Sequence, residues 1–259
     1  MPLMKTSNPA LGENTYRDAG QIHYGALGSS IDATSRMTLS GTVNKTAILL
    51  LCAVATAVYT WNQFLQTNNP ASVAGLLTLG GIGGLVVAFV TIFKKEWAPV
   101  TAPLYALLEG LVLGGISAVF NLRYPGIAME AVGLTFGTLF ALLLAYKVGL
   151  IKVTRTFALG VIAATGGIML FYLAEMVLGF FHITFSSING AGPVGILFSL
   201  FVVAIAALNL VLDFNFVEQG VAYGAPKYME WYSAFGIMVT LVWLYLEMLR
   251  LLSKLNSRR

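Results

Sequence analysis

Four acidic residues of this chain lie within or at the border of long apolar stretches. Glu109 stands in LEGLVLGG, Glu175 in FYLAEMVLGFF, Asp213 in LNLVLDFNF and Glu247 in WLYLEMLRLL. An ionisable side chain inside a membrane span costs at least about 2–3 kcal/mol and commonly marks an ion or proton pathway. We therefore predict that Asp213 and Glu247 form a pH-sensing centre on an ion pathway, with Glu109 as a third member.

Three polar residues near these acids are expected to support them. Asn209 precedes Asp213 by four residues, so both lie on one face of a helix. Arg250 follows Glu247 by three residues, and an ordinary intrahelical ion pair between them is the alternative to a functional acid. Glu175 lies close enough to a segment end to reach the membrane surface by snorkelling. For Glu109 the alternative is a neutral, protonated acid bonded to a neighbouring helix, since burial favours the neutral form.

Asp213 and Glu247 could form a proton-controlled gate if their carboxyl groups come close together. Two neighbouring carboxylates in a low-dielectric setting cannot both ionise cheaply, so they share a proton and titrate as a coupled pair. The protonated pair would hold its two helices together. The deprotonated pair would repel itself and offer its oxygens as ligands to a cation.

The composition requires a bilayer as the solvent. Of 259 residues, 58% are hydrophobic and only 10% are charged, and the mean hydropathy is +0.81. Soluble domains carry about 25% charged residues. The net charge of +4 is too small to indicate a nucleic-acid partner. We expect no metal site and no enzyme, because the chain has two histidines and no G-x-S-x-G motif.

Apolar segments of membrane-spanning length divide the chain. A span needs roughly 17 to 25 apolar residues, and seven segments are expected to form helices on this criterion. They are Thr46–Leu65, Ala71–Phe93, Val100–Phe120, Ala131–Tyr146, Phe157–Phe181, Gly192–Leu212 and Trp231–Leu252. The expected fold is thus an all-α polytopic membrane protein. It has a polar, disordered N-terminal tail (1–44), a transmembrane domain (45–255) and a short basic tail (256–259).

Basic residues between the segments indicate the orientation. With the N-terminus inside, ten lysines and arginines fall on the inner side before the last segment and only Arg123 falls outside. The inner ten are Lys5, Arg17, Arg36, Lys45, Lys94, Lys95, Lys147, Lys152, Arg155 and Lys227. Because cytoplasmic loops carry the excess of positive charge, we predict a cytoplasmic N-terminus.

Pairs of glycines spaced four apart occur in three consecutive segments. They are Gly80 and Gly84, Gly110 and Gly114, and Gly133 and Gly137. In lipid, helices associate through close packing, which glycine permits. We predict that these six glycines line helix contacts, the alternative being chance spacing in a chain with 27 glycines.

Two of these segments resemble a known family. Ala102–Phe120, which reads APLYALLEGLVLGGISAVF, resembles the third-helix signature of the Bax inhibitor-1 (transmembrane Bax inhibitor motif) family. Leu244 to Glu247 looks like that family's last-helix motif, in which the acid is usually aspartate, and Asp213 falls where the family places its other acid. The closing stretch GAPKYMEWYSAFGIMVTLVWLYLEMLRLL is similar to the bacterial YccA-type branch. The resemblance covers about residues 36 to 255.

This resemblance implies both an architecture and a function. It implies seven helices with the last one central, in a bacterial inner membrane, and a pH-sensitive calcium leak gated by a pair of acids. Ca²⁺ would then be the permeant ion rather than a cofactor, and the partners would be cations and the lipid bilayer. The alternative implied for bacterial members is a non-transporting protein that regulates a membrane-bound protease or stress response.

The topology gives a first prediction. With seven full spans and a cytoplasmic N-terminus, a reporter fused after Arg259 should behave as extracytoplasmic. The comparison is a reporter fused after Lys152, which should behave as cytoplasmic. Cytoplasmic behaviour at both positions would instead require a last segment that re-enters the membrane without crossing it.

Overall fold

The fold is helical throughout the part of the chain that can be described. The computed structural model describes residues 36–181 and 185–258, so the expected tail lies outside it up to residue 35. Helices account for 86% of the structure, and the described residues form no strand beyond an isolated bridge between Arg36 and Pro226. The expected all-α class is confirmed.

Seven helices are long and apolar enough to cross a membrane, as predicted. They are α2 (Leu39–Thr67), α3 (Ala74–Phe93), α4 (Ala98–Arg123), α5 (Ile127–Lys147), α6 (Arg155–Gly179), α8 (Pro193–Ala222) and α9 (Met229–Asn256). Short 3₁₀ turns, η2 (Pro70–Val73) and η3 (Lys95–Trp97), precede α3 and α4. One helical turn, α7 (Ser186–Asn189), lies between α6 and α8.

Two helix ends differ from the sequence-based boundaries for local reasons. The first span begins at Leu39, inside the expected tail, because the Thr38 side chain caps α2 by accepting from the Gly41 amide at 3.0 Å. α8 continues ten residues past Leu212 to Ala222. It ends in a Schellman motif, in which Ala225 N donates to Gly220 O at 3.1 Å and Gly224 has a φ of +66°.

The chain forms two compact units, each described here by itself. Unit 1 contains Tyr124–Leu212 and residues 240–258, and unit 2 contains residues 36–123 and Asp213–Val239. Both α8 and α9 therefore pass from one unit into the other without a break in the helix.

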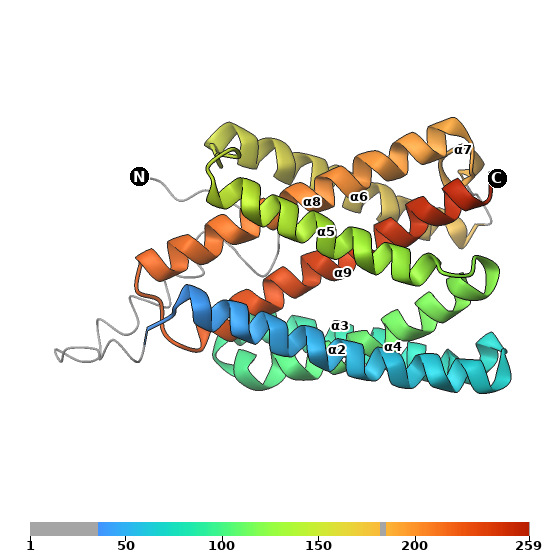
Figure 1. Cartoon of the computed structure of the whole chain (residues 1–259), viewed down its shortest axis with the longest axis horizontal. Helices are drawn as coiled ribbons and strands as arrows, with labels where there is room; N and C mark the ends of the chain where they lie inside the picture. Colours follow the sequence, from blue (N-terminus) through green and yellow to red (C-terminus); the bar gives the residue numbers. More distant parts are fainter. Residues whose placement is uncertain (1–35, 182–184, 259) are drawn as a thin grey trace. The chain divides into compact units, whose positions relative to one another are not determined.

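In unit 2, α2 and α4 meet at glycines with no room for a side chain. A Cβ on Gly114 would lie 2.7 Å from the Ala57 Cα, and one on Gly110 would lie 2.8 Å from the Ala53 carbonyl carbon. The approach also lets the Thr56 hydroxyl donate to the Leu107 carbonyl oxygen at 2.8 Å. Figure 1 shows α2, α3 and α4 side by side in this unit. Close backbone packing of this kind is what associates helices in lipid.

The other expected glycine contacts fall into two groups. Gly80 packs α3 on α4, where a Cβ would lie 2.6 Å from the Leu108 carbonyl oxygen, and Gly84 lies beside the Glu109 carboxylate. On α5, Gly133 and Gly137 are exposed, and among residues 36–181 and 185–258 no heavy atom outside their own helix backbone lies within 4 Å of either Cβ position. The structure thus gives these two glycines no contact of the kind predicted for them, because their face of α5 is unpacked.

In unit 1, α6 packs along α8 and α9. One cluster joins Ala158 and Val161 of α6 to Leu212 of α8. A second joins Ile168 of α6 to Val202 and Ile205 of α8, with Trp243 of α9 against it. These contacts fix the faces of α6 and α9 that carry the polar residues described below.

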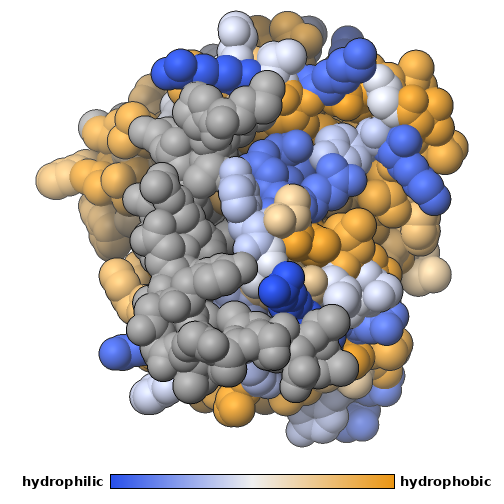
Figure 2. All heavy atoms as spheres, turned by 90° about the vertical axis from the view of Figure 1, so that its left-hand side faces the viewer, coloured by the Kyte–Doolittle hydropathy of each residue, from blue (hydrophilic) through white to orange (hydrophobic). Residues whose placement is uncertain are grey.

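The last helix is the most buried of the seven candidate spans. Of its most apolar window 61% is buried, against 50% for α8 and at most 39% for the others. Such burial fits a helix surrounded by others, as the prediction of a central last helix requires. Figure 2 views the molecule from the end where α2 begins and shows hydrophilic side chains among hydrophobic ones, as expected where helices leave the apolar part of a bilayer.

The glycine geometry gives a prediction with an internal control. Gly110→Leu and Gly114→Leu should lower the melting temperature in detergent by several degrees, because overpacking costs about 1–3 kcal/mol or more. Gly133→Leu and Gly137→Leu, at the same spacing on α5, should change it little. Equal losses in all four variants, measured by thermal unfolding of purified protein, would contradict the packing described for α2 and α4.

Candidate functional site

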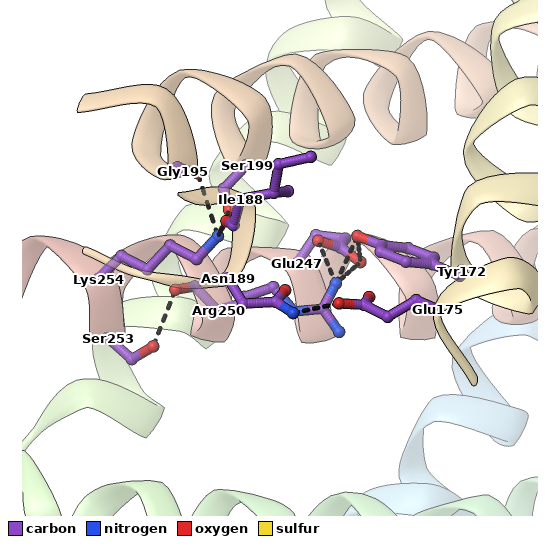
Figure 3. Close-up of polar contacts among 10 residues, drawn as sticks. All are labelled: Tyr172, Glu175, Ile188, Asn189, Gly195, Ser199, Glu247, Arg250, Ser253 and Lys254. Atoms are coloured by element: carbon purple, nitrogen blue, oxygen red, sulfur yellow. Dashed lines mark hydrogen bonds and ion pairs between the residues drawn. The ribbon is translucent and has the colours of Figure 1, made fainter. Parts of the chain in front are cut away.

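The C-terminal part of α9 carries a buried ion pair. The Glu247 side chain is only 4% exposed, and its Oε1 accepts a hydrogen bond from the Arg250 Nη1 at 3.0 Å. The second carboxylate oxygen lies 3.3 Å from the same nitrogen. Figure 3 shows this pair with its neighbours, all of which belong to unit 1. The two residues lie on one helix, so their spacing alone brings them together.

Tyr172 of α6 completes this pair from a second helix. Its hydroxyl donates to Glu247 Oε1 at 3.0 Å and accepts a hydrogen bond from Arg250 Nη1. The guanidinium also lies over the Tyr172 ring, 4.8 Å from its centroid. The Trp243 side chain, one turn before Glu247, gives a further hydrogen bond to the carboxylate. We call Tyr172, Glu247 and Arg250 the ion-pair cluster.

The Arg250 guanidinium and the Tyr172 hydroxyl favour the ionised form of the Glu247 carboxyl, whereas its burial favours the neutral acid. Hydrogen bonds with an ionised donor or acceptor are roughly twice as strong as those between neutral groups. The low dielectric constant of a buried site strengthens them more. Protonating Glu247 would remove its charge and so weaken the bonds to Arg250 and Tyr172 together. Binding of one proton to Glu247 can therefore weaken the hydrogen bond that connects α9 to α6.

Lys254, seven residues after Glu247, is fixed in a different way. It is 6% exposed, and its Nζ donates to Ile188 O at 2.7 Å, to Gly195 O at 3.0 Å and to Ser199 Oγ at 2.9 Å. All three ammonium donors are thereby used. This lysine joins α9 to α7 and to the start of α8.

Glu175 lies beside this region without entering the ion-pair cluster. Its Oε1 accepts a hydrogen bond from the side-chain amide of Asn189 in α7, and the residue is only half-buried. Figure 3 shows both side chains next to the ion-pair cluster. The contact connects the end of α6 to α7.

Asp213 and Glu247 fall in different compact units. Asp213 is fully buried in α8 within unit 2, whereas Glu247 belongs to unit 1. Within unit 1, the hydrogen-bond partners of Glu247 include Arg250 and Tyr172. Asn209, one turn before Asp213, is buried in unit 1 and donates to Thr165 Oγ1 of α6 at 2.8 Å.

Glu109 occupies a polar position of its own in unit 2. It is half-buried on α4, and the Tyr105 hydroxyl one turn earlier hydrogen-bonds its carboxylate. Tyr105 in turn packs edge-on against Phe235 of α9, with ring centroids 5.0 Å apart. The bonded partner of Glu109 is thus on its own helix, whereas the alternative given from the sequence placed this partner on a neighbouring helix. Within the described residues, no three His, Cys, Asp or Glu side chains group as they would around a metal ion.

A third buried acid, Glu230, was not among the residues predicted from the sequence. It is fully buried in the first turn of α9, where Oε2 lies 2.7 Å from Lys45 Nζ and Oε1 lies 2.9 Å from Lys227 Nζ. Oε1 also accepts from the Thr38 amide at 2.9 Å and from its hydroxyl at 2.8 Å. A Cβ on Gly41 would overlap this carboxylate, so the start of α2 is built around it.

Sequence signals existed for some of these partners. An acid in the first turn of a helix, as at Glu230, is a common stabilising position, and Thr38 precedes an apolar segment as a cap does. Tyr172 lies three residues before Glu175 on one face of its helix. Lys227 precedes Glu230 by three residues, so this ion pair is a local one. The contacts of Lys45 with Glu230 and of Tyr172 with Glu247 depend on packing between helices, which local spacing does not encode.

Comparison with known proteins identifies the family. A sequence model of the family described as Bax inhibitor 1 like matches residues 4–257, nearly the whole chain. The chain therefore belongs to this family, as its third-helix and last-helix motifs predicted. No curated protein and no solved structure gives a significant match to it.

The geometry of Glu230 gives a prediction about stability. Glu230→Gln should lower the melting temperature in detergent by several degrees, because it removes two ion pairs from a buried carboxylate. The loss should stay below the roughly 3–5 kcal/mol of a wholly buried pair, since Lys227 is half exposed.

The matched control is Glu130→Gln, which alters an exposed acid in the first turn of α5. It should change the free energy of unfolding by no more than about 0.5 kcal/mol, and so leave the melting temperature nearly unchanged. Similar behaviour of the two variants in thermal unfolding would show that Glu230 does not tie α9 to α2.

Proposed function

We propose that this member of the Bax inhibitor 1 like family is a passive, pH-sensitive cation leak of the bacterial inner membrane. Its N-terminus would be cytoplasmic and Ca²⁺ the permeant ion. The observation that carries the proposal is Glu247, an ionisable residue almost fully buried in a candidate membrane span and held by Arg250 and Tyr172. Residues of this kind in membrane proteins mark ion and proton pathways by default.

The ion-pair cluster supplies the proposed pH sensor. At neutral pH the ionised Glu247 binds Arg250 and Tyr172, which holds α9 to α6 and corresponds to the closed state. As the pH falls, protonation of Glu247 cancels the charge that both partners bind. The tie between α6 and α9 weakens, so the leak should increase toward acidic pH.

The other buried acids are the proposed ligands of the ion. Oxygen atoms of carboxylates suit hard cations such as Ca²⁺. Asp213 is fully buried in α8, and Glu109 lies half-buried on α4 beside the buried Gly84 of α3. Both belong to unit 2. In this proposal the acids of unit 2 attract the ion, and the ion-pair cluster of unit 1 senses the pH.

The sign of the pH response separates this gate from a shared-proton pair of acids. An Asp213–Glu247 pair would be closed when protonated and open when ionised, so its leak would increase as the pH rises. The Glu247–Arg250 gate predicts the opposite direction, because an ion pair needs the ionised acid. A single wild-type profile therefore distinguishes the two.

The experiment is calcium flux into liposomes that contain the purified protein, from about pH 6 to about pH 8. Wild-type flux should rise several-fold toward the acidic end. Glu247→Gln and Arg250→Gln should each give a high flux that no longer depends on pH, and Tyr172→Phe should reduce the pH dependence in part. The control is Glu130→Gln, an exposed acid, which should keep the wild-type profile.

Three results would reject the proposal in distinguishable ways. Absence of protein-dependent flux at every pH would reject the leak itself. A wild-type pH response in both Glu247→Gln and Arg250→Gln would reject the ion-pair cluster as the sensor. Loss of the response in Asp213→Asn and Glu247→Gln, with Arg250→Gln unaffected, would favour the paired acids instead.

A further inference from the structure

An apolar groove runs along one face of α6 in unit 1. Its volume is about 400 Å³, and it is lined by six α6 residues between Thr165 and Met176 and by Trp243 of α9. The six recur at intervals of one, three or four residues, so they form a continuous stripe about 16 Å long. A stripe of this length and width suits one extended hydrocarbon chain.

The outer rim of the groove is open. Met169 is 69% exposed, Leu173 50% and Met176 57%, which is a high exposure for large apolar side chains that line a cavity. In water such a surface would be an aggregation hazard. In a bilayer it is a site where hydrocarbon can enter from the side.

The groove has a definite polar end. Ile168 packs near Trp243, and Tyr172 bonds Glu247 one turn further along both helices, so α6 and α9 run in the same direction here. Arg250 lies past Tyr172 in that direction. Because α9 ends at Asn256, about 9 Å beyond Arg250, this end of the groove lies close to the end of the span.

Arg250 retains capacity to bind a second anion. It contacts Glu247 and Tyr172 through Nη1, and its side chain is 44% exposed. Figure 3 shows the other terminal nitrogen pointing away from both partners. A guanidinium presents five donors in a rigid fork that matches phosphate. The guanidinium lies over the ring of Tyr172, which itself lines the groove.

We propose that this groove is a binding site for one anionic phospholipid of the surrounding bilayer. One acyl chain lies along α6 from Met176 toward Thr165, against Trp243, and the phosphate is bound by Arg250. An acyl chain joined to an anionic head is the bilayer component that complements both an apolar stripe and a cation at one end. Arg250 would then lie between two anions, the phosphate of the lipid and the carboxylate of Glu247.

The test is native mass spectrometry of the full-length protein, released from detergent after incubation with phosphatidylglycerol or with phosphatidylcholine of the same chain length. The wild-type protein should retain phosphatidylglycerol several-fold more than phosphatidylcholine. Arg250→Gln should reduce the retained phosphatidylglycerol to the phosphatidylcholine level, whereas Arg250→Lys should keep part of the preference. Leu173→Gln, at an exposed position of the groove, should reduce retention of both lipids.

The matched control is Arg258→Gln, which removes an exposed arginine near the same end of α9 and should keep the wild-type preference. Equal retention of the two lipids by the wild-type protein would overturn the proposal. So would an equal loss in Arg258→Gln and Arg250→Gln, which would indicate general charge attraction, or unchanged retention in Leu173→Gln. In another outcome the protein dimerises when lipid is removed and stays dimeric when phosphatidylglycerol is added. That result would overturn the proposal and assign the groove to a second copy of the chain.

Discussion

A charge that is buried in a bilayer must be compensated within the protein, and the organisation of α9 follows from this constraint. Three charged residues of α9 are buried: Glu230, Glu247 and Lys254. Each meets partners from other segments, namely Lys45 and Thr38 for Glu230, Tyr172 for Glu247, and the carbonyls of Ile188 and Gly195 for Lys254. An uncompensated charge at any of these positions would cost several kcal/mol. The three anchors therefore determine which neighbouring segments α9 contacts in each unit.

The three anchors differ in how they respond to a change of charge. Lys254 donates to neutral oxygens and Glu230 is bound by two lysines, so each is held from several directions. Glu247 has one cation, and that cation lies on its own helix and is 44% exposed. Loss of charge at Glu247 removes its ionic attraction to Arg250 and weakens the hydrogen bond from Tyr172. Among the three, Glu247 is thus the anchor that a single proton can release, which is why the proposed sensor lies there.

The sequence was sufficient for the fold class and for part of the site. Hydropathy alone predicts seven spans, because each must supply about 20 apolar residues. The pairing of Glu247 with Arg250 also follows from sequence, as a contact three residues apart on a helix. Spacing could not reveal Tyr172 of α6 or Lys45 of α2, because both come from other helices. The four-residue spacing of glycines also predicted helix contacts at Gly133 and Gly137. In the described residues no other helix packs against these two positions.

The central claim is that Glu247 and Arg250 act as one pH-sensitive unit, and a double-mutant cycle measures this directly. Thermal stability in detergent would be compared for the wild type, Glu247→Gln, Arg250→Gln and the double variant, at neutral and at acidic pH. The account predicts a coupling energy of about 1 kcal/mol or more at neutral pH that disappears at acidic pH. Additive effects of the two substitutions at neutral pH, or a coupling that does not change with pH, would contradict it.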